Sequence, residues 1–85
     1  MSPIAIHSLE SVSVAEADVY LDAAQGDELT AAYHLAADRN ILDGSSDPPD
    51  DSEVHHALFL IRRARGLDAP SFDDTRCQLR RRVAA

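Results

Sequence analysis

Apolar residues recur with the spacing of an α-helix over four stretches of the chain. Over 53–65 they occupy nearly every side of the helix at its middle, which is typical of a helix buried on several sides. Over 28–41 they recur at i, i+3, i+4 and i+7 and form one apolar stripe. Shorter patterns predict helices over 14–24 and 72–84. These patterns predict an all-α protein, a small bundle of three to four short helices.

The same patterns predict which side chains face the core. The apolar side of 14–24 is expected at Val14, Ala17, Val19, Tyr20, Leu21 and Ala24. The stripe of 28–41 consists of Leu29, Ala32, Tyr33 and Ala36, widened by Ala31, Leu35 and Leu42. The helix over 72–84 has a thin stripe of Phe72, Leu79 and Val83, which predicts partial docking.

Residues with capping propensity set the expected helix ends. Ser13 and Glu16 match the capping box, in which each side chain accepts from the other's backbone N–H. Gly26 predicts the end of the first helix. One long helix through Gly26 is the alternative, since a mid-helix glycine costs only about 1 kcal/mol. The other N-caps are expected at Asp27, at Asp51 or Ser52, and at Ser71.

Two segments fall outside the helical patterns. Residues 1–12 are expected to form an extended N-terminal arm, although Ile4 and Ile6 alternate with small or polar residues as in a short strand. Residues 43–52 are predicted to form an acidic loop, because the adjacent prolines in it disfavour helix and sheet. With 85 residues, the chain is predicted to be one domain, 1–85.

Charge is distributed unevenly along the chain, whose formal net charge is −7. Residues 1–53 carry twelve acidic residues against one arginine, and 54–85 carry three acidic residues against seven arginines. The first part therefore has a charge of −11 and the second of +4. Such asymmetry indicates either an interaction surface, or two parts that neutralise each other within one chain or between two copies.

The acidic part suggests a function by binding. Carboxylates spaced roughly like phosphates would fit a basic site on a nucleic-acid-binding protein, through the complementarity that steers charged partners. A solvated face that only keeps the protein soluble is the alternative. The residues of this candidate acidic face are Asp18, Asp22, Asp38, Asp43, Asp47, Asp50 and Asp51.

The helix over 53–65 supplies a second candidate surface. Its aliphatic side chains outnumber its aromatic ones, which suits either the core of the domain or a seam shared between two copies. We therefore predict a homodimer, with pairing of helices as the mode of association. The residues assigned to this core or seam are Val54, Leu58, Phe59 and Ile61.

The helices over 53–65 and 72–84 with their glycine-containing turn resemble a helix-turn-helix in outline. This supports an alternative function, a DNA-binding transcriptional regulator. The excess of acidic residues opposes it, because affinity for DNA depends mainly on positive charge. The residues that would contact nucleic acid are Arg76, Arg80, Arg81 and Arg82.

Catalytic and metal-binding patterns are weak. Glu53 and His56 have the E-x-x-H spacing of di-iron proteins, but a second pair and further glutamates are missing. The loop after Asp43 lacks the glycine position of an EF-hand. Cys77 has arginine neighbours, yet a half-buried structural thiol is expected there. We therefore predict no enzymatic activity, no cofactor and no metal.

The sequence also bears on location. No apolar run approaches the roughly 20 residues needed to cross a bilayer, and the first residues do not have the pattern of a signal peptide. A single cysteine excludes an internal disulfide. We therefore expect a cytoplasmic regulator, an inhibitor or adaptor that docks on a protein partner. A small subunit or chaperone of a larger assembly is a further alternative.

Overall fold

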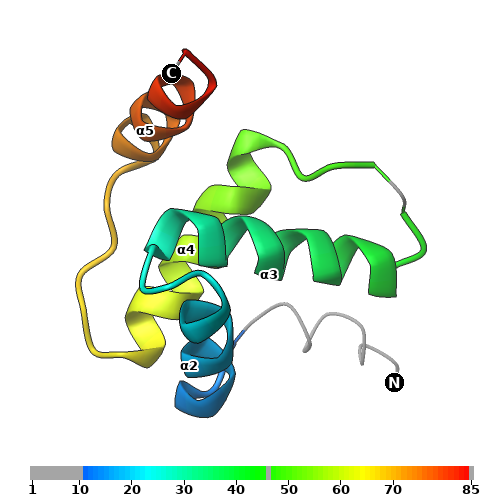
Figure 1. Ribbon diagram of the computed structural model, residues 1–85, viewed down its shortest axis with the longest axis vertical. Coiled ribbons are helices and arrows are strands. Elements are labelled where there is room, and N and C mark those ends of the chain that lie inside the picture. The colour runs from blue at the N-terminus through cyan, green and yellow to red at the C-terminus, as the bar shows by residue number, and fades with distance from the viewer. Residues whose placement is uncertain (1–10, 46, 85) are drawn as a thin grey trace.

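The computed structural model describes residues 11–45 and 47–84, and within these ranges the chain forms four helices and no strand (Figure 1). The helices are α2 (Val14–Ala23), α3 (Glu28–Leu42), α4 (Asp51–Ala64) and α5 (Phe72–Ala84). The predicted all-α class is therefore confirmed. The predicted N-terminal arm falls largely on residues 1–10, outside the described residues, and the homodimer stays a prediction.

Two capping boxes fix the starts of α2 and α4. At α2 the predicted box is confirmed, because Glu16 N donates to Ser13 Oγ and Ser13 N donates to Glu16 Oε1, both at 3.1 Å. The predicted cap of α4 at Asp51 or Ser52 is wrong, because Asp50 is the N-cap. Asp50 has Glu53 three residues later to return the hydrogen bond, whereas the other two positions would have valine or histidine there.

The chain breaks between α2 and α3, so the alternative of one long helix is wrong. Gln25 and Gly26 both adopt positive φ angles, of 58° and 84°. Gly26 N donates to Leu21 O at 2.8 Å, which satisfies a carbonyl at the end of α2. Glycine tolerates this conformation without the steric cost that a Cβ imposes, and Gly26 therefore ends the helix as predicted.

The core of the domain lies around α4. Val54, Leu58 and Ile61 are buried against helices of the same chain, and Phe59 is only partly buried. Figure 1 shows α4 crossing behind α3, with α2 beside both. The helix over 53–65 is therefore the core of a single chain, and its most apolar side is already covered.

Small side chains bring α3 close to the core. The buried residues of α3 are Leu29, Ala31, Ala32, Leu35 and Ala36. Tyr33 and Leu42 were predicted to extend this stripe, but they are 40% and 76% exposed. Tyr33 lies at the edge of the buried side of α3, beside an open hollow that Leu29 and Leu79 also line, and Leu42 lies at the last turn, beyond the packed region.

The other predicted stripes also hold in part. On α2, Ala17 and Leu21 are buried, but Val14 and Val19 are exposed, which contradicts their predicted core positions. Val12, which precedes α2, is buried and belongs to the core. The sequence pattern does not predict the burial of Val12, because this residue precedes the helix and has no place in its apolar period.

Helix α5 is attached largely through polar contacts. Thr75, its one fully buried side chain in the described part, has Oγ1 2.8 Å from His55 Nδ1 of α4 and 3.3 Å from Ser71 O. Leu79 is partly buried and Phe72 is exposed. Partial docking is therefore confirmed. The side chain of Val83 lies outside the described residues.

Ion pairs within the chain neutralise part of the charge of the acidic and basic parts of the sequence. Among the described residues, four of the five ion pairs join a carboxylate of 1–53 to an arginine of 54–85. They pair Glu28 with Arg62 and Arg65, Asp51 with Arg76, and Asp27 with Arg82. The charge asymmetry thus contributes to holding α4 and α5 against the first part of the fold.

Asp27 is expected to make stability sensitive to acid. Hydrogen bonds from Arg82 and Thr30 lower the pKa of Asp27 from 3.8 to about 2. Because the pKa is lower in the folded state, the carboxylate stabilises the fold above about pH 4, and this contribution is lost as the pH falls towards 2. Asp27→Asn should flatten the fall in thermal midpoint across that window, followed by circular dichroism. A profile identical to wild type would contradict this role.

Candidate functional site

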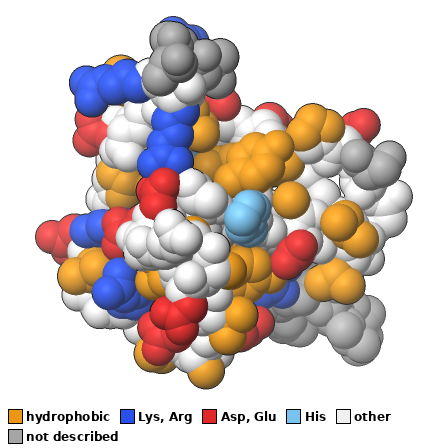
Figure 2. Space-filling view, in the orientation of Figure 1, with side chains coloured by type: hydrophobic (Ala, Val, Ile, Leu, Met, Phe, Trp, Pro, Cys, Tyr) orange, Lys and Arg blue, Asp and Glu red, His pale blue; other side chains and the backbone are white. Residues whose placement is uncertain are grey.

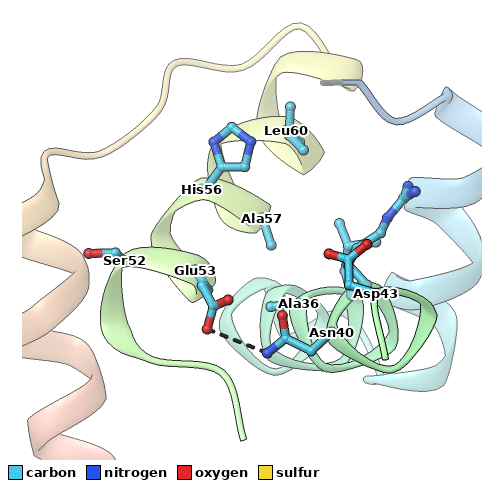
Figure 3. Close-up of a pocket in the computed structure, with 10 residues that line it drawn as sticks. Ala36, Asn40, Asp43, Ser52, Glu53, His56, Ala57 and Leu60 are labelled. Carbon is cyan, nitrogen blue, oxygen red and sulfur yellow. Dashed lines mark hydrogen bonds between the residues drawn. The ribbon is translucent and has the colours of Figure 1, made fainter. Parts of the chain in front are cut away.

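A groove of about 320 Å³ lies between α3 and α4 (Figure 3). Its floor is apolar and consists of buried side chains, which are Leu35, Ala36, Ala57 and Leu60. Figure 3 shows Ala57 of α4 directed towards α3, with Leu60 one turn further along α4. The volume is at the small end of the range for ligand pockets, which suits a few apolar side chains better than a large cofactor.

The rim of the groove is polar. It comprises Arg39, Asn40 and Asp43 of the α3 side and Ser52, Glu53 and His56 of α4. Glu53 Oε1 accepts from Asp50 N at 2.9 Å and from Asn40 Nδ2 at 3.4 Å, so it joins α4 to α3 (Figure 3). These hydrogen bonds hold one end of the groove in place.

The carboxylates set the sign of charge at this rim. The Arg39 guanidinium lies 3.8 Å from a Glu16 carboxylate oxygen, which balances its charge. Asp43 is the C-cap of α3 and is exposed. Asp43 and Glu53 therefore place negative charge at the rim of the groove, above a floor of buried apolar side chains.

The residues of the candidate acidic face are distributed over different surroundings. Three of them serve the fold, since Asp50 caps α4, Asp51 pairs with Arg76, and Asp38 accepts a hydrogen bond from Tyr20. The other four are exposed, and their carboxylates form no hydrogen bond or ion pair with the described residues. They are Asp18, Asp22, Asp43 and Asp47.

These four do not form one surface. Asp18 lies about 160° around α2 from Tyr20, at 100° per residue, and Tyr20 is the side chain that faces α3 and bonds Asp38. Asp18 and Asp22 are therefore on the side of α2 away from Asp38, whereas Asp43 is at the groove. The structure thus separates the predicted acidic face into an α2 part and a groove part.

Tyr20 and Asp38 join α2 to α3 beside an open hollow of about 410 Å³. The Tyr20 hydroxyl donates to Asp38 Oδ2 at 2.6 Å. Burial, and then the hydrogen bond to the Asp38 carboxylate, raises the pKa of Tyr20 from 10.0 to about 12. The side chains of Tyr20 and Asp38 therefore hold α2 against α3, and the Asp38 carboxylate is engaged within the fold.

Alkaline titration is expected to detect the hydrogen bond from the Tyr20 hydroxyl to the Asp38 carboxylate. The neutral Tyr20 hydroxyl stabilises the fold fully below about pH 10, and this contribution is lost as the pH rises towards 12. In ultraviolet absorbance, Tyr20→Phe should remove a tyrosinate step near pH 12, and Asp38→Asn should move that step to lower pH. A Tyr20 step that Asp38→Asn leaves in place would contradict the assignment.

The candidate nucleic-acid contacts are partly occupied within the fold. Arg76 lies 3.8 Å from Asp51 and 5.6 Å from the Phe72 ring centroid. Arg82 donates to Asp27 at 2.6 Å and to Thr30 at 2.8 Å. Arg80 and Arg81 are exposed on the far part of α5. Two of the four arginines, Arg76 and Arg82, therefore pair with carboxylates of the same chain, although their side chains remain 40% and 46% exposed.

The Glu53–His56 pair and Cys77 were the weak sequence patterns for metal binding and for a thiol, and the structure shows what surrounds each of them. Glu53 and His56 both line the groove, but Glu53 caps α4 and His56 stacks on Phe59 with ring centroids 6.4 Å apart. Within residues 11–45 and 47–84 no three His, Cys, Asp or Glu side chains gather as a metal site would require. Cys77 is exposed, so the expected half-buried thiol is wrong.

The groove itself was not predicted from the sequence. Asn40 and Ser52 belong to no motif, and they reach the rim only because α3 and α4 cross. Figure 2 shows one face of the molecule, on which hydrophobic side chains lie around a surface histidine. Among the described residues, no helix is both long and apolar enough to cross a membrane.

Comparisons with protein-family models, with curated proteins and with solved structures found no match for this chain.

Proposed function

We propose that this protein is a small acidic regulator, an inhibitor or adaptor, that acts by docking on a positively charged partner protein rather than by catalysis. The observation that carries this proposal is the use of charge in the fold. Among the described residues, five of the eight arginines form ion pairs, while four exposed aspartates of the candidate acidic face, which are Asp18, Asp22, Asp43 and Asp47, form none. The surface that remains is strongly acidic.

Docking on a basic protein fits this surface. Complementary charge raises the rate of encounter and fixes orientation, whereas apolar contact supplies most of the affinity. The aliphatic residues of α4, including Leu58 and Ile61, cannot supply that contact, because the chain's own helices bury them. The floor of the groove between α3 and α4 is buried to the same degree, so the exposed rim of that groove, with Asp43, is the surface left for a partner.

The alternative of a DNA-binding regulator has less support. Arg76 and Arg82 face carboxylates of the same chain, and Asp73 and Asp74 lie in the first turn of α5. A recognition helix usually contacts base edges with its N-terminal residues, where these two carboxylates would meet phosphate repulsion. Arg80 and Arg81 alone would remain for nucleic acid.

The test is affinity capture from a lysate of the source organism, with nuclease treatment, at low and at high salt. We expect a protein that survives nuclease, is recovered at fixed stoichiometry, and is released at about 1 M salt, where the screening length falls to about 3 Å. Recovery of nucleic acid without a stable protein, abolished by Arg80→Ala with Arg81→Ala, would replace this proposal by the DNA-binding alternative.

A further inference from the structure

We propose that α5 is a detachable helix, which leaves α3 and α4 as one unit while the other three helices stay folded. The ion pairs near its two ends control how often it opens. Docking of α5 is then an autoinhibitory contact, because it withholds two arginines from any other acidic surface. In the docked state Arg76 is paired with Asp51. Arg82 is paired with Asp27. This inference goes beyond the proposed function and concerns the basic part of the chain.

Little apolar surface holds α5 in place. Helices α3 and α4 each bury five residues, whereas among residues 72–82 only Thr75 is buried. Thr75 is polar, and Leu79 packs against the core only in part. Apolar burial is the main favourable contribution to folding, and the units that open first are those with few buried apolar contacts. Among the helices, α5 is therefore the one that burial stabilises least.

The polar attachments of α5 lie at the surface. The Arg76 and Arg82 side chains are 40% and 46% exposed, and those of their carboxylate partners are exposed to a similar degree. Exposed ion pairs contribute little to stability, and salt screens them. Between these pairs, Thr75 Oγ1 lies 2.8 Å from His55 Nδ1, and water can replace this hydrogen bond when α5 leaves. The attachment is therefore weak and depends on ionic strength.

The connection between α4 and α5 contains a pivot. Its first part is fixed to α4, because Leu67 N donates to Arg62 O at 2.8 Å and Arg62 Nε donates to Asp68 O. Its last residue, Ser71, belongs to α5, whose Asp74 N donates to Ser71 Oγ at 3.2 Å. Residues 69 and 70 form no hydrogen bond with the described residues. A few such loop residues are enough to absorb a hinge motion, and Figure 1 shows α5 at one end of the molecule.

Opening changes the charge that the chain presents. Arg76 and Arg82 lose their carboxylate neighbours and join Arg80 and Arg81, which are already exposed. The segment 72–84 carries these four arginines against two aspartates, so the released segment is basic and is tethered to an acidic body. Docking of α5 thus decides whether this basic segment is available to an acidic surface.

The test is native-state hydrogen exchange of the full chain, labelled with ¹⁵N and followed by NMR at low salt and at about 1 M NaCl. An undocked helix of 13 residues is too short to stay helical in water, so opening exposes its amides. We expect the amides of Thr75, Leu79 and Arg82 to exchange together, at least about tenfold faster than those of Leu58 and Ile61. High salt should speed exchange in α5 about threefold and should not speed it in α4.

Two arginine variants test the control by ion pairs. Arg82→Ala removes the contacts with Asp27 and Thr30. Arg80→Ala is the matched control, because it makes the same change of net charge at an exposed side chain that forms no ion pair with the described residues. We expect Arg82→Ala to speed exchange in α5 at least about threefold, and Arg80→Ala to change it by less than about twofold. Exchange in α4 should stay the same in both variants.

Three results would overturn the inference. Equal exchange rates in α5 and α4, with equal dependence on urea, would mean that α5 leaves only when the whole chain unfolds. Fast exchange at Arg82 with slow exchange at Thr75 and Leu79 would mean that the helix end frays and that α5 does not open as a unit. Equal effects of Arg82→Ala and Arg80→Ala would mean that the ion pair with Asp27 does not control the opening.

Discussion

Ile61→Asp is expected to unfold the protein. Ile61 is fully buried in the core, near the C-terminal end of α4. Truncating such a side chain alone costs about 2–5 kcal/mol, and an unpaired buried carboxylate adds a further penalty. Domains of ordinary stability have about 5–15 kcal/mol in total, and a chain of 85 residues has a small core. The helical circular dichroism signal should be lost at room temperature.

The matched control is Ile41→Asp. Ile41 is 66% exposed near the end of α3, so the same substitution there buries nothing. We expect a loss of no more than about 1 kcal/mol, from an acidic residue near a helix C-terminus. A folded, cooperative Ile61→Asp variant would show that α4 is not the centre of the core.

Glu28→Gln is expected to destabilise the fold by about 1.5–3 kcal/mol, the range for hydrogen bonds that involve charged groups. The Glu28 carboxylate accepts from Arg62 at 2.5 Å and from Arg65 at 3.1 Å, and its side chain is largely buried. The substitution leaves both guanidinium groups without this charge. Urea unfolding should show a lower midpoint with an unchanged slope.

Glu16→Gln serves as the control for Glu28→Gln. Glu16 pairs with Arg39 at 3.8 Å and its side chain is about half exposed. Glutamine also satisfies the capping box, so the expected loss is at most about 1 kcal/mol, as for exposed ion pairs. If both variants lost the same free energy of unfolding, the pairs of Glu28 with Arg62 and Arg65 would contribute no more to stability than an exposed ion pair.

Local signals in the sequence were sufficient for the helices. The box of Ser13 and Glu16 and the break at Gly26 were predicted because capping and left-handed geometry depend on a few neighbouring residues. The burial of Val54, Leu58 and Ile61 was predicted because their helix is apolar on several sides. The neutralisation of the two charged parts was also one of the two interpretations of the charge pattern.

Features that depend on how helices cross could not be predicted. Tyr33 has the right spacing for the apolar stripe of α3, but it lies at the edge of the side that packs on the core and lines an open hollow. Val12 is buried although it lies outside any periodic pattern. The groove joins residues up to 25 positions apart in the sequence, such as Leu35 and Leu60, and their meeting depends on how α3 and α4 cross rather than on any motif.

Folding also separates structural charges from available ones. In the sequence Asp38, Asp43 and Asp51 are equivalent members of one acidic run. In the structure Asp38 holds Tyr20 and Asp51 faces Arg76, whereas Asp43 stands at the rim of the groove. This division is why we place docking at the groove and not over the whole acidic surface.

Docking on a protein partner is tested most directly by quantitative affinity capture with three forms of the full chain, which are wild type, Asp43→Arg and Asp22→Arg. Each is immobilised at equal density, treated with nuclease, and its bound proteins are quantified by mass spectrometry. We expect to capture one protein that wild type and Asp22→Arg retain in equal amounts and that Asp43→Arg does not retain. Retention of that protein by Asp43→Arg together with its loss by Asp22→Arg would contradict docking at the groove, and capture of no protein by any form would contradict the proposed function.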